Sequence, residues 1–179
     1  MDALFIAVSR FDPSDGQRWT DYCQWSKLPA LAEIVSLDTL LCPRLLTEID
    51  DADWAHIVNA DWRLAYFYRL DYLLQRVAGL PRRNILGLYR NPTQHIAAPP
   101  AAGPFVFMGY DLVEEMTQIS ALTNCGGFHE TFANDELNRV GLIHNFARAS
   151  EIQRSLRQNN PDEPHAQCEL YAIWRLDEI

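Results

Sequence analysis

The strongest constraint on the fold is an alternating pattern near the end of the chain. Residues 168–177 read CELYAIWRLD, in which Cys168, Leu170, Ala172, Trp174 and Leu176 recur at every second position. Successive side chains of a β-strand point to opposite faces, so this alternation predicts a strand. The fold must therefore contain a sheet.

Other segments predict further strands and helices. Short apolar runs predict strands over 3–11, 84–90 and 105–112, and a further apolar segment, 119–128, ends in a turn at Gly126-Gly127. Helical spacing of apolar residues predicts helices over 19–26, 62–77 and 146–156. Thr47 is expected to cap one more helix, whose buried side would include Trp54, Ile57 and Val58.

These elements together predict an α+β (mixed α/β) fold, with one sheet of four or five strands packed against three or four helices. The length of 179 residues suits a single globular domain over residues 1–179. Residues 92–104 contain four prolines and one glycine, so we expect a long, exposed Ala/Pro-rich loop there.

The composition excludes several classes of protein. Twenty-four acidic against fifteen basic residues give a net charge of -9, which argues against nucleic-acid binding. No apolar run reaches the roughly 18 residues needed to span a bilayer, and the N-terminus has no basic segment typical of a secretory signal. We therefore expect a cytoplasmic protein that does not act at membranes and whose four cysteines are reduced.

The acidic residues are unevenly distributed along the chain. No Lys or Arg occurs between Arg44 and Arg63, or between Arg90 and Arg139. The acids of interest in these two base-free stretches are Asp50, Asp51, Asp53, Asp61, Asp111, Glu114, Glu115, Glu130, Asp135 and Glu136. If folding brings the two stretches together, their combined field would attract a basic partner. The alternative is that these are solvated surface acids that keep the protein soluble.

A second hypothesis is a small cysteine-dependent enzyme. Cys125 precedes Gly126 and Gly127, and His129 lies four residues after the cysteine. A nearby histidine can accept the proton of a nucleophilic thiol, a role that His129 or His165 would take.

A third hypothesis is a structural zinc site. Two cysteines and two histidines can complete a tetrahedral site, here Cys125, His129, His165 and Cys168. The face shared by Cys168, Leu170 and Trp174 favours a thiol packed in the core instead.

Several phrases of the chain resemble a family of small uncharacterised bacterial proteins. They are LDTLLCP (37–43), DWAHIVNADW (53–62), LDYLLQRV (70–77), YRNP (89–92), GYDLVE (109–114), ISALTNCGGF (119–128) and PHAQCELYAIWR (164–175). The resemblance covers most of the chain from about Leu37 onward and implies no particular activity. In general character the chain is also similar to immunity proteins, which are small, acidic inhibitors of bacterial toxins.

The leading expectation is therefore a non-enzymatic binding protein without a cofactor, of the immunity type. It would occlude a basic partner, such as a cognate toxin domain, through an acidic face. Acidic side chains would guide the encounter, and aromatic side chains would hold the complex.

Overall fold

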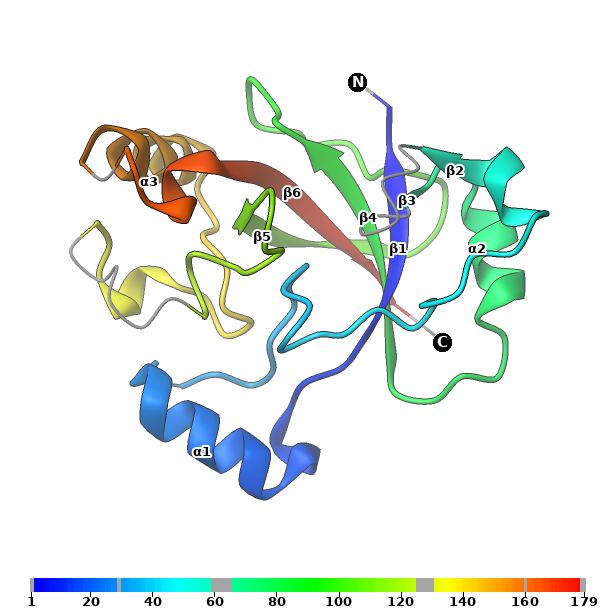
Figure 1. The fold of residues 1–179 in the computed structure, drawn as a ribbon, viewed down its shortest axis with the longest axis horizontal. Helices are drawn as coiled ribbons and strands as arrows, with labels where there is room; N and C mark the ends of the chain where they lie inside the picture. Colours follow the sequence, from blue (N-terminus) through cyan, green and yellow to red (C-terminus); the bar gives the residue numbers. More distant parts are fainter. Residues whose placement is uncertain (1, 29, 59–65, 125–130, 160, 178–179) are drawn as a thin grey trace.

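The computed structural model describes residues 2–28, 30–58, 66–124, 131–159 and 161–177 (Figure 1). The strands are β1 (Leu4–Ser9), β2 (Ile57–Val58), β3 (Tyr66–Phe67), β4 (Arg83–Arg90), β5 (Phe105–Glu114) and β6 (Cys168–Leu176). The α-helices are α1 (Gln17–Ser26), α2 (Leu70–Arg76) and α3 (Phe146–Asn159). Four single 3-10 turns complete the elements, namely η1 (Pro13–Asp15), η2 (Asp53–His56), η3 (Asn134–Glu136) and η4 (Pro164–Gln167).

The strands form one antiparallel sheet in the order β2-β3-β1-β4-β6-β5. The predicted α+β class is confirmed, and the three α-helices agree with the expected number. The predicted number of strands is too low, because the described sheet has six. Two of these, β2 and β3, are only two residues long, and no alternation can be recognised over so short a length.

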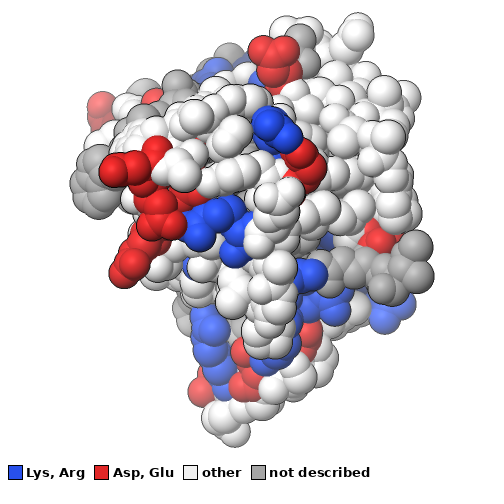
Figure 2. All heavy atoms as spheres, turned by 90° about the vertical axis from the view of Figure 1, so that its right-hand side faces the viewer, with Lys and Arg blue, Asp and Glu red and all other residues white. Residues whose placement is uncertain are grey.

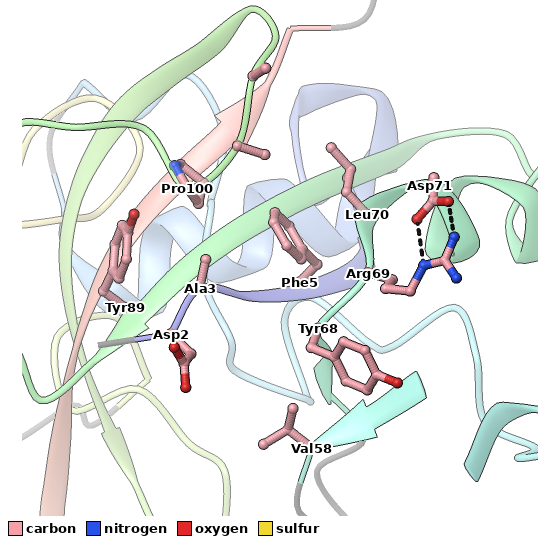
Figure 3. A pocket seen from close by; sticks show the side chains of 12 residues that line it. Asp2, Ala3, Phe5, Val58, Tyr68, Arg69, Leu70, Asp71, Tyr89 and Pro100 are labelled. Carbon is pink, nitrogen blue, oxygen red and sulfur yellow. Dashed lines mark hydrogen bonds and ion pairs between the residues drawn. The ribbon is translucent and has the colours of Figure 1, made fainter. Parts of the chain in front are cut away.

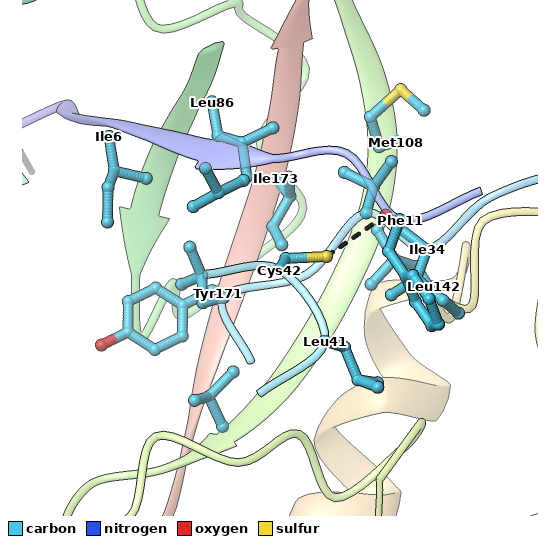
Figure 4. Close-up of a cluster of buried hydrophobic side chains, with 14 of the residues drawn as sticks. Ile6, Phe11, Ile34, Leu41, Cys42, Leu86, Met108, Leu142, Tyr171 and Ile173 are labelled. Carbon is cyan, nitrogen blue, oxygen red and sulfur yellow. Dashed lines mark hydrogen bonds between the residues drawn. The ribbon is translucent and has the colours of Figure 1, made fainter. Parts of the chain in front are cut away.

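One face of the sheet packs against α1 and the chain that follows it. Leu4, Ile6 and Val8 of β1 belong to the same buried cluster as Trp19 and Tyr22 of α1. Leu28 and segment 30–42 also contribute to this cluster. Figure 4 shows the Cys42 thiol inside it, where Sγ lies 3.4 Å from the carbonyl oxygen of Ile34. We call this side of the sheet the α1 face.

The opposite face packs against α2 and α3. Phe5 and Ala7 of β1 form a buried cluster with Leu73 and Val77, from α2 and its C-terminal end. At the other end of this face, Tyr110, Leu112, Leu170 and Ala172 pack against the stripe on α3 formed by Ala149, Ile152 and Leu156. The predicted buried stripe of this last helix is therefore confirmed.

The predicted helix after Thr47 is wrong. The chain forms only the short turn η2 there, and Ile57 and Val58 continue as β2. Both residues are β-branched, which favours an extended backbone, and they pair with Phe67 and Tyr66 of β3. The following helix begins only at Leu70, because residues 66–67 are needed for β3.

The Ala/Pro-rich segment connects β4 and β5 without regular secondary structure, as predicted. Most of its residues are exposed, although Pro92 is buried and Pro100 and Ala101 are partly buried. Within the described ranges, no helix combines the length and the apolar character that crossing a membrane requires.

Candidate functional site

A groove of about 990 Å³ opens between β1, the start of α2 and the Ala/Pro-rich loop (Figure 3). We call it the β1–α2 groove. It is lined by Asp2, Ala3, Phe5, Val58, Tyr68, Arg69, Leu70, Asp71, Tyr89, Pro100, Ala101 and Ala102. The lining combines aromatic and aliphatic side chains with a few charged groups, as is common in binding sites.

The wall formed by the loop depends on Gly87 in the middle of β4. A Cβ atom at this position would lie 2.2 Å from Cγ of Pro100, so the missing side chain makes room for the proline. On the same wall, the Tyr89 hydroxyl donates a hydrogen bond of 3.4 Å to the carbonyl oxygen of Pro99. The loop is thus seated directly on the sheet.

The charged groups of the groove partly neutralise one another. Arg69 and Asp71 form an ion pair, in which Arg69 Nε lies 3.0 Å from Asp71 Oδ1 (Figure 3). The hydrogen bonds from Arg69 hold the pKa of the Asp71 carboxyl below its usual range. Asp2, at the other side of the groove, is exposed.

Two half-exposed aromatic side chains lie at the β2 edge of the sheet, and one of them, Tyr68, lines the groove. Tyr68 is 46% exposed and donates a hydrogen bond to the carbonyl oxygen of Ala55. Trp54, the neighbour of Ala55, is 49% exposed. Large aromatic side chains are usually buried more deeply than these two. Because Trp54 and Tyr68 are half exposed, both are available to a partner. With Asp50 and Asp51 they form what we call the β2-edge surface.

Asp53, directly below this surface, is fully buried and has a structural role. Its carboxylate accepts hydrogen bonds from Tyr72 Oη (2.7 Å), Arg76 Nε (2.8 Å) and the backbone N–H of Asp50 (2.8 Å). Burial opposes ionisation, but these hydrogen bonds and the Arg76 charge hold the pKa of Asp53 below its usual value. Asp53 therefore joins η2 to α2, and its carboxylate is fully occupied by contacts within the chain.

The structure distributes the ten predicted partner-binding acids among different environments. Asp50, Asp51, Glu115 and Asp135 are exposed, whereas Asp53, Asp111 and Glu114 are buried. Glu136 is half-buried and forms an ion pair with Arg148, which lowers the pKa of its carboxyl to about 2. Asp61 and Glu130 lie outside the described residues.

For the acids that the structure describes, the expectation that the two base-free stretches form one acidic face is wrong. The first stretch contributes η2 and β2 at one edge of the sheet, and the second contributes β5 at the opposite edge. Figure 2 shows the side of the molecule that carries β2 and α2, where groups of acidic side chains lie beside basic ones. The exposed acids therefore belong to separate surfaces.

The residues of the enzyme and zinc hypotheses are described only in part. Cys125 and His129 lie outside the described residues. His165 Nδ1 contacts the buried carboxylate of Glu114. Cys168 is 1% exposed, and burial raises the pKa of its thiol well above the usual range. Among the described residues, no group of three or more His, Cys, Asp or Glu side chains is suited to hold a metal ion.

Sequence reasoning missed the groove because its walls come from segments far apart in the chain. One signal was present, namely a glycine inside the apolar strand 84–90, which often marks a close approach of another backbone. The long loop after that strand provides the approaching segment.

No protein-family model matches the chain, and no curated protein or solved structure matches it either. The resemblance to a bacterial family and to immunity proteins therefore stays a prediction.

Proposed function

We propose that this chain is a non-enzymatic binding protein of the immunity type, which inhibits a basic toxin domain by covering it. The partner docks on the β2-edge surface and inserts side chains into the neighbouring β1–α2 groove. The observation that carries this proposal is the exposure of two aromatic side chains: Tyr68, which lines the groove, and Trp54, which precedes Ala55, the residue whose carbonyl oxygen Tyr68 contacts.

The electrostatics of the chain support a basic partner. The net charge of -9 attracts a positively charged protein from a distance and raises its association rate at low salt. Close to the surface, Asp51 is exposed and Asp50 keeps 65% of its side chain exposed despite an ion pair with Arg76. These two carboxylates can therefore meet basic side chains of the partner.

The exposed aromatic side chains and the open groove favour a protein, rather than a small molecule, as the partner. Interfaces between proteins are commonly held by a few aromatic anchors that become buried on binding. Trp54 and Tyr68 can take this role, while the open groove receives apolar side chains against Phe5 and Leu70. The occlusion mechanism needs no reacting group on this chain.

The test is to purify the tagged protein from its host, identify the protein that accompanies it, and measure the affinity of the purified pair by calorimetry. Trp54→Ala should weaken binding at least ~10-fold, because it removes a central aromatic anchor. Trp25 offers a matched control, since it is 51% exposed but belongs to α1. Trp25→Ala should change the affinity less than about two-fold.

Two results would contradict the proposal. One is an equal loss of affinity in the Trp54 and Trp25 variants, which would place the interface elsewhere. The other is tight binding of a metabolite by a preparation in which no basic protein partner is found.

A further inference from the structure

A pair of buried carboxylates occupies the α1 face of the sheet, far from the groove. Asp111 and Asp38 are both 0% exposed. Asp111 lies on β5 opposite Tyr171 of β6, whose side chain belongs to the cluster on the α1 face. Its sequence neighbours Tyr110 and Leu112 belong to the cluster around α3 on the other face. The alternation of β5 therefore directs the Asp111 side chain into the core.

Two serines hold the Asp111 carboxyl group in place. Ser36 Oγ lies 2.5 Å from Asp111 Oδ2, and Ser120 Oγ lies 2.6 Å from Oδ1. The backbone N–H of Leu112 also donates to Oδ1, at 2.9 Å. Ser36 Oγ accepts one backbone N–H, that of Asp38, and so keeps a second lone pair that can accept a hydrogen bond from a protonated Asp111.

Asp38 connects the same two segments through their backbones. Its Oδ1 accepts from the N–H groups of Leu40 and Leu41, each at 2.9 Å, and its Oδ2 accepts from the N–H of Ser120 at 2.8 Å. In addition, Thr39 N donates to the carbonyl oxygen of Gln118 at 3.0 Å. Segments 36–41 and 118–123 are thus fastened to β5 and to each other through the two carboxyl groups.

The hydrogen-bond donors to both carboxyl groups are neutral throughout the described part of the chain. This differs from the usual buried carboxylate, which is paired with a cation. The titratable and charged groups on the surrounding elements are Tyr22 of α1, Glu33 and Cys42 of the following segment, Glu114 of β5, Cys168 and Tyr171 of β6, Arg157 of α3, and Arg18 of α1, which donates to the carbonyl oxygen of Leu40. Burial raises the pKa values of Tyr22, Cys42, Cys168 and Tyr171, so these groups stay uncharged near neutral pH.

We propose that Asp111 and Asp38 form a pH-responsive latch, which fastens segments 36–41 and 118–123 to the sheet while Asp111 is protonated and loosens when Asp111 loses its proton. Deprotonation places a second negative charge beside Asp38 in a region that water does not reach. The hydrogen bonds from Ser36, Ser120 and the Leu112 N–H compensate this buried charge only in part, because none of these donors carries a positive charge, so the network relaxes by opening.

The acid–base properties of Asp111 agree with this arrangement. Burial raises its pKa to about 6, with a further contribution from the Asp38 charge, against the opposing effect of the serine hydrogen bonds. An unfolded aspartate has a pKa of about 3.9. The folded state therefore binds more protons between these two values, and its stability falls as the pH rises through about 6.

Hydrogen exchange of single amides tests the latch directly. The N–H groups of Leu40, Leu41 and Ser120 donate to Asp38, so their protection reports on the latch. After correction for intrinsic exchange, their protection should fall about 10-fold between pH 5 and pH 7. Amides of α3 should change less. Equal protection at both pH values would overturn the proposal.

The variant Asp111→Asn provides the second test, because it imitates the protonated acid and cannot ionise. In this variant the protection of the same three amides should be independent of pH over this range. A pH dependence as large as in the wild type would show that another group is responsible. If the variant does not fold, the carboxyl carbon of Asp111 in the wild-type protein can be followed by NMR. A midpoint near pH 6 supports the latch, and one below about 4 refutes it.

Discussion

Asp53 and Asp111 are both fully buried, but they lie at opposite edges of the sheet and in opposite electrostatic surroundings. Asp53 precedes β2 and forms an ion pair with Arg76, which lies on α2. Asp111 belongs to β5 and receives hydrogen bonds from Ser36 and Ser120. The pKa of the first is lowered and that of the second is raised.

This difference shows that burial alone does not decide the charge of a carboxyl group. Both side chains are inaccessible to solvent, but only Asp53 is paired with a guanidinium. The two residues are therefore expected to contribute to stability over opposite ranges of pH. Four measurements test whether the charge of the neighbouring groups, rather than burial, sets the contribution of each carboxyl group.

The largest effect is expected for Asp53→Ala. The substitution leaves the guanidinium of Arg76, which is 28% exposed, and the hydroxyl of Tyr72 without their buried acceptor. We expect a loss of about 3 kcal/mol in the free energy of unfolding, measured by urea denaturation at pH 7. A loss below about 0.5 kcal/mol would mean that the ion pair does not hold η2 against α2.

The second effect concerns the pH dependence of stability. The contribution of Asp111 falls as the pH rises through about 6, so the free energy of unfolding should drop by about 1.4 kcal/mol between pH 5 and 7. Asp53, whose pKa is lowered, contributes stability above its unfolded pKa and loses it as the pH falls toward acid. In denaturation series at several pH values, Asp111→Asn should remove the loss of stability toward neutral pH. Asp53→Asn should remove the loss of stability toward acid pH.

A smaller effect is expected for the half-buried pair of Glu136 and Arg148. Because the pKa of Glu136 is lowered to about 2, its stabilising contribution is present above its unfolded value and is lost as the pH falls through about 2. The pair is about 30% exposed, so solvent screening limits the loss in Glu136→Gln to about 1 kcal/mol at pH 7. Comparing the thermal unfolding of Glu136→Gln and the wild type at pH 7 and at pH 3 measures the stabilising contribution of Glu136 and its loss in acid.

The smallest effect is expected for Asp50→Asn. Asp50 Oδ2 lies 3.1 Å from the same guanidinium that binds Asp53, but its own side chain is 65% exposed. Exposed ion pairs contribute little, so the change should stay within about 0.5 kcal/mol. A loss as large as that of Asp53→Ala would show that the guanidinium, and not the burial of its partner, dominates this site.

The sequence was informative about the long elements and less so about how they assemble. The central strands and α3 were predictable because their apolar residues repeat over several turns or alternations. The paired residues Ile57–Val58 and Tyr66–Phe67 were not, since their strand character depends on each other. The positions of the two acidic stretches at opposite edges of the sheet could not be predicted either, because the strand order of a sheet is not encoded in any local sequence pattern.

The candidate site was predictable only in its general character. The excess of acids and the aromatic residue at position 54 are visible in the sequence. The burial of Asp53, Asp111 and Glu114 is not, because it results from the packing of α2, segment 36–41 and η4 around them.

The contact between Gly87 and Pro100 restricts the substitutions that the chain can tolerate at position 87. Any side chain at residue 87 would lift the loop away from the strand and alter the width of the neighbouring opening. Most exposed residues of the loop can be substituted without affecting the sheet. Gly87 cannot gain a side chain while the Pro100 ring packs against it. Variation in what this chain recognises is therefore expected in the loop and at the outer margin, while the glycine stays constant.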